Sequence, residues 1–378
     1  MLSCSVLIFF LSGCSDPVPT LTIGSGDPPT TTVSPPRASP PRVVSTGSLP
    51  TAPPSSACPG HRIGVYAWDQ SYWRGGNDEL LGFLSSSLAA SWACGDVYIN
   101  VGDYSTTVIP DWDKLTNFIV KYRKTTGRSD SVVWMTYGDV TARSGLAMIQ
   151  FTNASFDWAT AVSQTDSDRM GRIGISYDVE HLSPTDTETA LLLCRSRREE
   201  TPFGSSRLLI SHTLDGDLNV GGTDVVMRLA DSALAMVYSN FVDAPLRPDI
   251  PPTTSLPATL AWLVTTQCKK CLQQNNYRAR ITLMVEASCQ MGKGCGQMSF
   301  CAADGGAEYM SGVLDDSVAR LVKLGVLTPQ QITQLFDLDA PFVAHNWEWF
   351  RCFPPFSDSV TYPNCEQYKS LAASCRTI

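Results

Sequence analysis

The sequence predicts an α/β fold, a (β/α)8 TIM barrel that follows a disordered N-terminal stalk. Short apolar runs of strand length alternate with longer, helix-compatible stretches over residues 58–378, which is the pattern of a parallel sheet with helices between its strands. Eight such runs occur in this stretch, and that number and length fit a closed barrel. The phosphate-loop patterns GxxxxGK[ST] and GxGxxG, which would favour an open nucleotide-binding sheet, are absent.

The expected strands share a short apolar core rich in β-branched and aromatic residues. In chain order they are Arg62–Trp68, Asp96–Val101, Ser131–Tyr137, Gly171–Asp178, Arg207–His212, Leu234–Tyr238, Arg280–Glu286 and Pro341–Trp347. The expected helices between them are Asn77–Ala93, Asp111–Lys124, Asp186–Glu199, Ala258–Asn275 and Met310–Gly325. Thr328-Pro-Gln-Gln331 places proline at a first helical position, which predicts a short helix before the last strand.

Residues 1–57 are expected to lie outside the barrel. Val6–Leu11 is an apolar run too short to span a bilayer as a helix, so residues 1–14 resemble a signal peptide or a lipoprotein signal. Leu11-Ser-Gly-Cys14 is similar to a lipoprotein box, which makes Cys14 a candidate membrane tether, although no Lys or Arg precedes the apolar run. Residues 15–57 are rich in Pro, Ser and Thr and cannot bury enough apolar surface to offset their ordering entropy. They are predicted to form a disordered stalk.

Charge and cysteine usage limit the partners and the compartment. The net charge is -8 and no basic stripe occurs, which argues against nucleic acid as a partner. Eleven of the thirteen cysteines follow residue 57, so a secreted or extracellular-surface protein with disulfides is expected, and the odd count leaves one thiol free or bridged to another chain. Zinc at Cys268-Lys-Lys-Cys271 is the alternative, but no second CxxC or paired histidines complete a site. We therefore expect no metal and no cofactor.

One N-glycosylation sequon lies outside the stalk. Asn153-Ala-Ser155 predicts a surface position, if the host glycosylates the protein.

The expected fourth strand ends in two carboxylic acids. Asp178 and Glu180 lie two residues apart, so on a strand their side chains point to the same face. Two close carboxyls do not both ionise easily, so one keeps a proton near neutral pH and can act as an acid, as in enzymes that cleave sugars. The alternative is a solvated strand end, because Asp-x-Glu is a common sequence.

The other expected strand ends are also aromatic and acidic. In a barrel of this kind the catalytic groups lie where strands run into their following loops. Aromatic faces stack on sugar rings while carboxylates and amides bind hydroxyls; the alternative is that the aromatic residues only pack the barrel. The candidate substrate-binding residues are Tyr66, Trp68, Tyr137, Asn240, Glu286, Trp347 and Trp349.

Four short segments, in the correct order, resemble the family 18 glycoside hydrolases, the group of chitinases and endo-N-acetylglucosaminidases. They are Gly64-Val-Tyr-Ala-Trp68 on the first strand, Ser176-Tyr-Asp-Val-Glu180 at the end of the DxxDxDxE motif, Met236-Val-Tyr238 on the sixth strand and Asn346-Trp-Glu-Trp349 on the eighth. The chain departs from the family at Ile173 and Ser176, where the motif has aspartates, and at Thr136-Tyr-Gly-Asp139, where the family has Ser-x-Gly-Gly.

The resemblance implies a reaction and its residues. Glu180 would be the general acid, and Asp178 would orient the N-acetyl group of the substrate, whose oxygen attacks the anomeric carbon. Tyr238 would hydrogen-bond that group. Trp347 would form the floor under the sugar, or Trp349 if the register differs by two. The substrate would be a glycan containing β-linked N-acetylglucosamine, cleaved by substrate-assisted retaining catalysis.

Two alternatives remain open from the residues. A conventional retaining glycosidase would need a second carboxylate about 5 Å from Glu180, and an inverting one a separation of roughly 6.5–9.5 Å; Glu286 at the seventh strand end is the candidate partner. An inactive barrel that binds carbohydrate as a lectin does is the second alternative, because a fold does not determine a function.

Overall fold

The computed structural model describes most of the region after residue 61. The described residues are 62–74, 78–103, 111–139, 145–163, 167–179, 182–200, 208–214, 222–237, 256–268, 270–273, 277–288, 300, 306–338, 342–353, 356 and 365–366. All of them belong to the second of the two units into which the chain divides, Ala52–Ile378. Residues 1–14 and 15–57 lie outside the described residues, so the signal and the stalk stay predictions.

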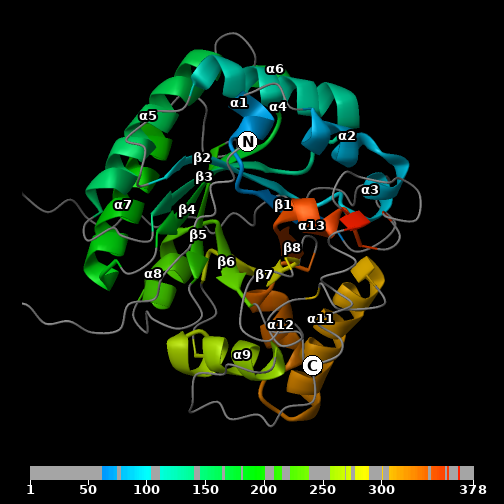
Figure 1. Ribbon diagram of the computed structural model, residues 1–378. Helices are drawn as coiled ribbons and strands as arrows, with labels where there is room; N and C mark the ends of the chain where they lie inside the picture. The colour runs from blue at the N-terminus through cyan, green and yellow to red at the C-terminus, as the bar shows by residue number, and fades with distance from the viewer. Residues whose placement is uncertain are drawn as a thin grey trace, which may run out of the picture. The chain divides into compact units, whose positions relative to one another are not determined.

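Eight parallel strands form a closed barrel in the order of the chain, which confirms the predicted fold. The strands are β1 (Ile63–Ala67), β2 (Val97–Asp103), β3 (Val133–Asp139), β4 (Ile173–Val179), β5 (Leu208–Leu214), β6 (Ser232–Met236), β7 (Arg280–Glu286) and β8 (Phe342–His345). Closure is made by β1 and β8, with Ile63 paired to Phe342. Figure 1 shows the strands at the centre with the helices around them.

The helices follow the strands as expected, with some additions. They are α1 (Ser71–Arg74), α2 (Glu79–Ser85), α3 (Ser87–Trp92), α4 (Trp112–Thr126), α5 (Leu146–Ser163), α6 (Ser167–Met170), α7 (Pro184–Glu200), α8 (Gly222–Leu229), α9 (Leu256–Trp262), the π-helical turn η1 (Leu263–Gln267), α11 (Gly306–Lys323), α12 (Pro329–Leu335) and α13 (Trp347–Phe350). Helix α12 begins at Pro329, as the proline pattern predicted, and Thr328 caps it in a capping box with Gln331. No helix among the described residues is long and apolar enough to cross a membrane.

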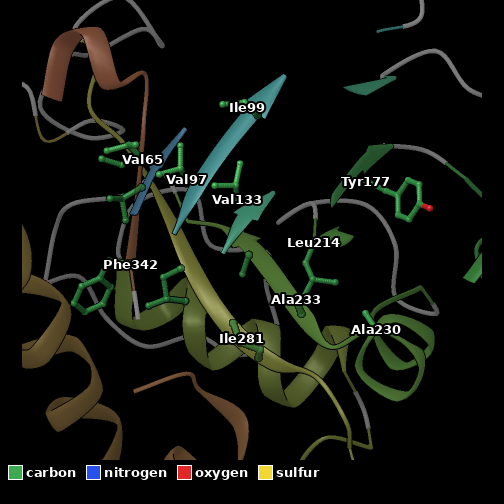
Figure 2. Close-up of a cluster of buried hydrophobic side chains, with 14 of the residues drawn as sticks. Val65, Val97, Ile99, Val133, Tyr177, Leu214, Ala230, Ala233, Ile281 and Phe342 are labelled. Atoms are coloured by element: carbon green, nitrogen blue, oxygen red, sulfur yellow. The ribbon is translucent and has the colours of Figure 1, made fainter. Parts of the chain in front are cut away.

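The alternation of side chains along the strands divides the apolar residues into two clusters. One cluster lies between the barrel and the surrounding helices and includes the residues labelled in Figure 2, among them Val65, Val97, Ile99, Val133 and Tyr177. The second contains the intervening residues of seven strands, so it fills the barrel from within; its members include Tyr66, Tyr98, Trp134, Met284 and Val343. Any strand residue can therefore be assigned to the inner or the outer face.

Large aromatic rings fill the inside of the barrel. Tyr98 stacks on Tyr66 at 5.8 Å and on Trp134 at 5.7 Å between ring centroids. Asp96 anchors the Trp134 indole N–H at 2.8 Å. A Cβ on Gly174 would lie 2.3 Å from the Trp134 ring, so the indole occupies the space above this glycine. These stacked rings fill the interior of the barrel, so a binding or catalytic site can form only at the carboxyl ends of the strands.

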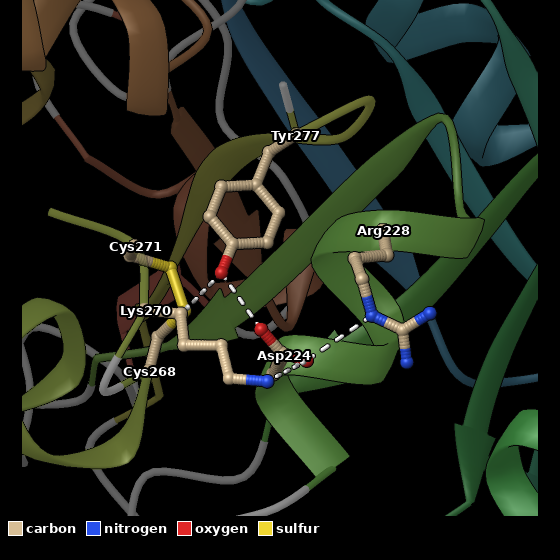
Figure 3. Close-up of a disulfide and its surroundings, with 6 residues drawn as sticks. All are labelled: Asp224, Arg228, Cys268, Lys270, Cys271 and Tyr277. Atoms are coloured by element: carbon tan, nitrogen blue, oxygen red, sulfur yellow. Dashed lines mark hydrogen bonds and ion pairs between the residues drawn. A yellow bond between two sulfur atoms is a disulfide. The ribbon is translucent and has the colours of Figure 1, made fainter. Parts of the chain in front are cut away.

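Two disulfides lie among the described residues, Cys268–Cys271 and Cys352–Cys365. Cys268 and Cys271 are bonded to each other, so the structure favours the disulfide over the zinc alternative (Figure 3). Next to this disulfide, the hydroxyl of Tyr277 donates a hydrogen bond to Oδ1 of Asp224 at 2.7 Å. Cys194 is buried and is the free cysteine of the described part of the chain.

The sequon lies within helix α5, which the sequence did not predict. Asn153 is half-buried and Ser155 is fully buried, so the sequon is less exposed than a surface position requires. The apolar residues of α5 are not confined to one face, and this weakens the periodic signal of a helix.

Candidate active site

Asp178 is a buried carboxylate at the carboxyl end of β4. It shares the inner face of the barrel with Gly174 and Ser176, because residues two apart on a strand point the same way. Its side chain is 3% exposed, and the hydroxyl of Tyr66 on β1 donates to its Oδ2 at 3.4 Å. The structure thus brings together two residues that the sequence proposed for the site, Tyr66 on β1 and Asp178 on β4.

Trp68, directly after β1, lies next to this pair. Its ring is 4.9 Å from that of Tyr66, and a Cβ on Gly138 of β3 would lie 3.1 Å from it. The ring therefore covers Gly138, where a larger residue would displace it. The Trp68 side chain is only half-buried, whereas that of Tyr66 is buried. Among the described aromatic residues predicted for the site and found on the inner face, Trp68 is therefore the one whose ring a ligand can contact.

Glu286, at the end of β7, is fully buried and bonded on both oxygens. Its Oε1 accepts from the Ser288 backbone N–H at 2.6 Å and from the Asn346 amide at 2.8 Å, and its Oε2 lies 2.6 Å from His345 Nδ1. The Trp68 indole N–H in turn donates to His345 Nε2. Glu286 thus belongs to the predicted region, but its contacts are with protein groups, and this disfavours it as the second carboxylate of a conventional retaining enzyme.

Three predicted substrate-binding aromatic residues lie outside the inner face. Tyr137 points outward from β3, and its ring stacks on Phe151 of α5 at 5.3 Å. Trp347 is fully buried, 5.8 Å from the ring of Phe83, with the Arg351 guanidinium over its face, and Trp349 is 7% exposed in the same outer cluster. In this structure neither Trp347 nor Trp349 faces the inside of the barrel, which disfavours the predicted sugar floor at these positions. The physical reason is that β8 ends at His345 and α13 begins at once, which turns the two tryptophans into the outer core.

Several predicted residues lie outside the described residues. They are Glu180, Tyr238 and Asn240, so their roles stay predictions.

The two departures from the family motif take different positions. Ile173 is on the outer face and packs in the outer cluster. Ser176 is on the inner face, paired with Thr136 of β3, and both hydroxyls are buried with no hydrogen-bond partner among the described residues. At the Ser176 position the chain therefore has a neutral hydroxyl just below Asp178, where the motif has a carboxylate.

His345 and Asn346 are site residues that sequence reasoning did not single out. His345 was one of four scattered histidines, and Asn346 was noted at the end of the eighth strand and in a tryptophan motif but was not given a role. The signal that could have found His345 is the alternation of β8, since Phe342 and Ala344 pack outward while Val343 packs inside. Asn346 has φ 59°, and it is the one non-glycine residue with positive φ in the described part of the chain. Such backbone conformations are concentrated at functional sites.

The described residues contain no group of three or more His, Cys, Asp or Glu side chains that could hold a metal ion.

Comparison with known proteins finds similar folds at low sequence identity. No family model matches the chain, and neither does any curated protein. Among solved structures, a putative chitinase A from Streptomyces coelicolor is 13% identical with a TM-score of 0.45, and the match covers 84% of this chain and 99% of that one. An endo-β-N-acetylglucosaminidase from Cordyceps militaris is 11% identical with a TM-score of 0.38, covering 84% and 91%.

A family 18 chitinase from Pseudoalteromonas aurantia is also matched, at 12% identity and a TM-score of 0.41, over 83% of this chain and 99% of that one. An F420-dependent secondary alcohol dehydrogenase is matched as well, at 9% identity and a TM-score of 0.36, over 75% of this chain and 92% of that one. All of these matches are under 25% identical to the chain, so they concern the fold alone.

Proposed function

We propose that the protein is a glycoside hydrolase that acts on glycans containing β-linked N-acetylglucosamine. The observation that carries the proposal is the buried Asp178 at the carboxyl end of β4, which accepts from Tyr66 and lies two residues before Glu180. We place Glu180 on the same face as Asp178, because residues two apart in an extended chain point the same way. In that arrangement the two carboxyls and the half-buried Trp68 would be suited to protonating a glycosidic oxygen while an aromatic face supports the sugar. The chitinases and the endo-β-N-acetylglucosaminidase among the structural matches are consistent with this class.

The mechanism proposed is substrate-assisted. Glu180 protonates the leaving oxygen, Asp178 holds the acetamido group so that its oxygen attacks the anomeric carbon, and Tyr238 hydrogen-bonds the same group. This route needs no carboxylate nucleophile from the protein. It is supported by the contacts of Glu286, whose two oxygens are already engaged by Ser288, Asn346 and His345.

The proposed setting is outside the cytoplasm, as a secreted or surface-tethered protein. The two disulfides of the described residues support this compartment, because disulfides persist mainly where the surroundings are oxidising. Mass spectrometry of the mature N-terminus would show whether the chain is cleaved near residue 14 and whether Cys14 carries lipid.

One observation favours a second candidate, a barrel that binds the glycan and does not cleave it. Ser176 removes the carboxylate that the motif places beneath Asp178, and its hydroxyl carries no charge to support the ionisation changes of a catalytic cycle. The binding of sugar would require only the remaining inner-face residues.

One experiment tests the proposal and separates the candidates. Release of reducing sugar from a panel of N-acetylglucosamine oligomers and N-glycans is measured for the wild type and for Glu180→Gln. Because the amide cannot donate a proton to the leaving group, the variant should lose activity by at least about a hundredfold, the usual size of a general-acid contribution, and should still bind the oligomers. Equal activity in both proteins would show that Glu180 is not the acid, and binding without cleavage by the wild type would favour the second candidate.

A further inference from the structure

A chain of side-chain hydrogen bonds links three strands at the carboxyl end of the barrel. It runs from Trp68 after β1, through His345 on β8, to Glu286 on β7. The rings of Trp68 and His345 are 5.8 Å apart and nearly perpendicular, at 87°, so the indole N–H meets the imidazole edge. Each member is buried or half-buried, and the exposed fraction of Glu286 is 0%. Bonds of this kind inside a protein are stronger than in water because the surroundings screen them weakly.

The donor and acceptor roles in this chain follow from the chemistry of the groups. An indole N–H can only donate, so His345 Nε2 must be unprotonated to accept from Trp68. With Nε2 accepting, the Nδ1–H of the same ring donates to Glu286 Oε2 at 2.6 Å. Glu286 accepts from Ser288 and Asn346 on Oε1 and from His345 on Oε2. One direction of donation therefore runs from Trp68 through His345 to Glu286.

The far end of the chain is held by the backbone. Ser288 donates its N–H to Glu286 at 2.6 Å, and Asn346 reaches the same oxygen at 2.8 Å from a left-handed conformation. A non-glycine residue in this conformation is strained, although Asn tolerates it better than most residues. The strain persists because the surrounding contacts hold the residue, so Glu286 has a defined position.

The near end of the chain determines the position of the Trp68 ring. The ring has Gly138 on one side, Tyr66 at 4.9 Å, and His345 at its N–H edge, so rotation about its side-chain bonds would break the bond to His345. Tyr66 donates to Asp178, and this places the ring next to the candidate catalytic carboxylate. A platform that is ordered before the ligand arrives loses less side-chain entropy on binding and so binds more tightly.

We propose that Glu286 and His345 are positioning residues that hold Trp68 as the stacking platform for the sugar ring next to Asp178. The inference rests on the proposed function for its ligand class, an oligomer of N-acetylglucosamine. In this proposal Glu286 positions another residue and is not the second catalytic carboxylate. The aromatic ring under the sugar is that of Trp68, at the end of the first strand, and not a tryptophan that follows the eighth.

The test is a double-mutant cycle on oligomer binding. Affinity for an N-acetylglucosamine oligomer is measured by calorimetry in a Glu180→Gln background, which prevents turnover. His345→Leu removes the acceptor and Trp68→Phe removes the donor while keeping an aromatic face. Each should weaken binding by about tenfold, the range of a lost hydrogen bond, and the double variant should be no weaker than the worse single one, because both changes break the same bond.

Two further variants separate positioning from general damage to the fold. His345→Gln keeps an acceptor near the Nε2 position and should restore most of the affinity lost in His345→Leu. His212→Leu is the matched control, since His212 is a buried histidine on the outer face of β5, and it should leave oligomer binding unchanged.

The outcomes distinguish this inference from the proposed function. If the wild type binds the oligomer and the effects of His345→Leu and Trp68→Phe simply add, or His345→Leu binds as well as the wild type, the positioning role is overturned while the hydrolase proposal stands. If the wild type neither binds nor cleaves any oligomer, the proposed function fails and the role of Trp68 as a sugar platform fails with it. Non-additive losses with rescue by His345→Gln support the inference.

Discussion

His212 makes the stability of the barrel depend on pH in a range where few other groups titrate. Its ring lies on the outer face of β5, 5% exposed and 6.2 Å from the ring of Tyr177. Burial lowers the pKa of His212 from 6.5 to about 4, and the hydrogen bond from Nδ1 to the Thr213 carbonyl at 2.6 Å opposes this only in part. The folded protein thus holds the imidazole neutral.

The sign and size of the effect follow from proton linkage. Below pH 6.5 the unfolded chain takes up a proton at His212 while the folded protein does not, so stability is fully present above 6.5 and is lost as the pH falls toward 4. Between about pH 7.5 and about pH 5 these two pKa values correspond to a loss of about 2 kcal/mol in the free energy of unfolding.

The assay compares urea unfolding of the wild type and His212→Phe at both pH values. Phenylalanine keeps a planar ring in the apolar cluster but does not titrate. The lost bond to Thr213 lowers the stability of the variant about equally at both pH values, so it cancels in the difference. The wild type should therefore lose about 2 kcal/mol more than the variant on acidification. Equal losses in the two proteins would refute the reasoning, because other groups would then account for all of the acid sensitivity.

Two further predictions concern the inside of the barrel. Gly174→Ala would place a Cβ 2.3 Å from the Trp134 ring and should lower the free energy of unfolding by about 3 kcal/mol through overpacking. In the control Gly312→Ala the new Cβ meets nothing within 4 Å, so this change should raise the free energy of unfolding by up to about 1 kcal/mol through helix propensity. Thermal unfolding of both variants measures these effects, and a shift of the two midpoints in the same direction would contradict the packing argument. Tyr66→Phe removes the hydroxyl that donates to Asp178 at 3.4 Å and should lower kcat/KM for an N-acetylglucosamine oligomer by roughly tenfold with little change in the unfolding midpoint. A variant with wild-type kcat/KM would show that this bond does not serve the reaction.

Much of the fold could be predicted because its signal is local. All eight strands occur where apolar, β-branched runs predicted them, and β7 occupies the predicted range Arg280–Glu286. Helix α5 was missed since its apolar residues surround it, and a periodic pattern of polar and apolar residues is what identifies a helix in a sequence. Asn77–Ala93 was predicted as one helix but is divided into α2 and α3 at Ser86, which caps the second helix through the Ala89 N–H.

The site could be predicted in part. Asp178, Tyr66 and Trp68 were named from their positions at strand ends, and the structure brings them together. Trp347 and Tyr137 were named on the same grounds and lie on the outer face. Residue type and a position at a strand end are not enough to predict a site residue. Successive side chains of a strand point alternately inward and outward, so the face also depends on the position within the strand and on the residue at which the strand ends.

The sequence by itself determined the number and order of the strands and the position of Asp178 at the end of the fourth. These properties depend on residues that are neighbours along the chain. Only the tertiary structure decided that Glu286, His345 and Trp68 act as one hydrogen-bonded chain, because their separations of 59 and 277 residues are closed by the meeting of β7, β8 and β1 in the barrel. Contacts of that kind are determined by barrel closure and strand register, which no local pattern of residues encodes.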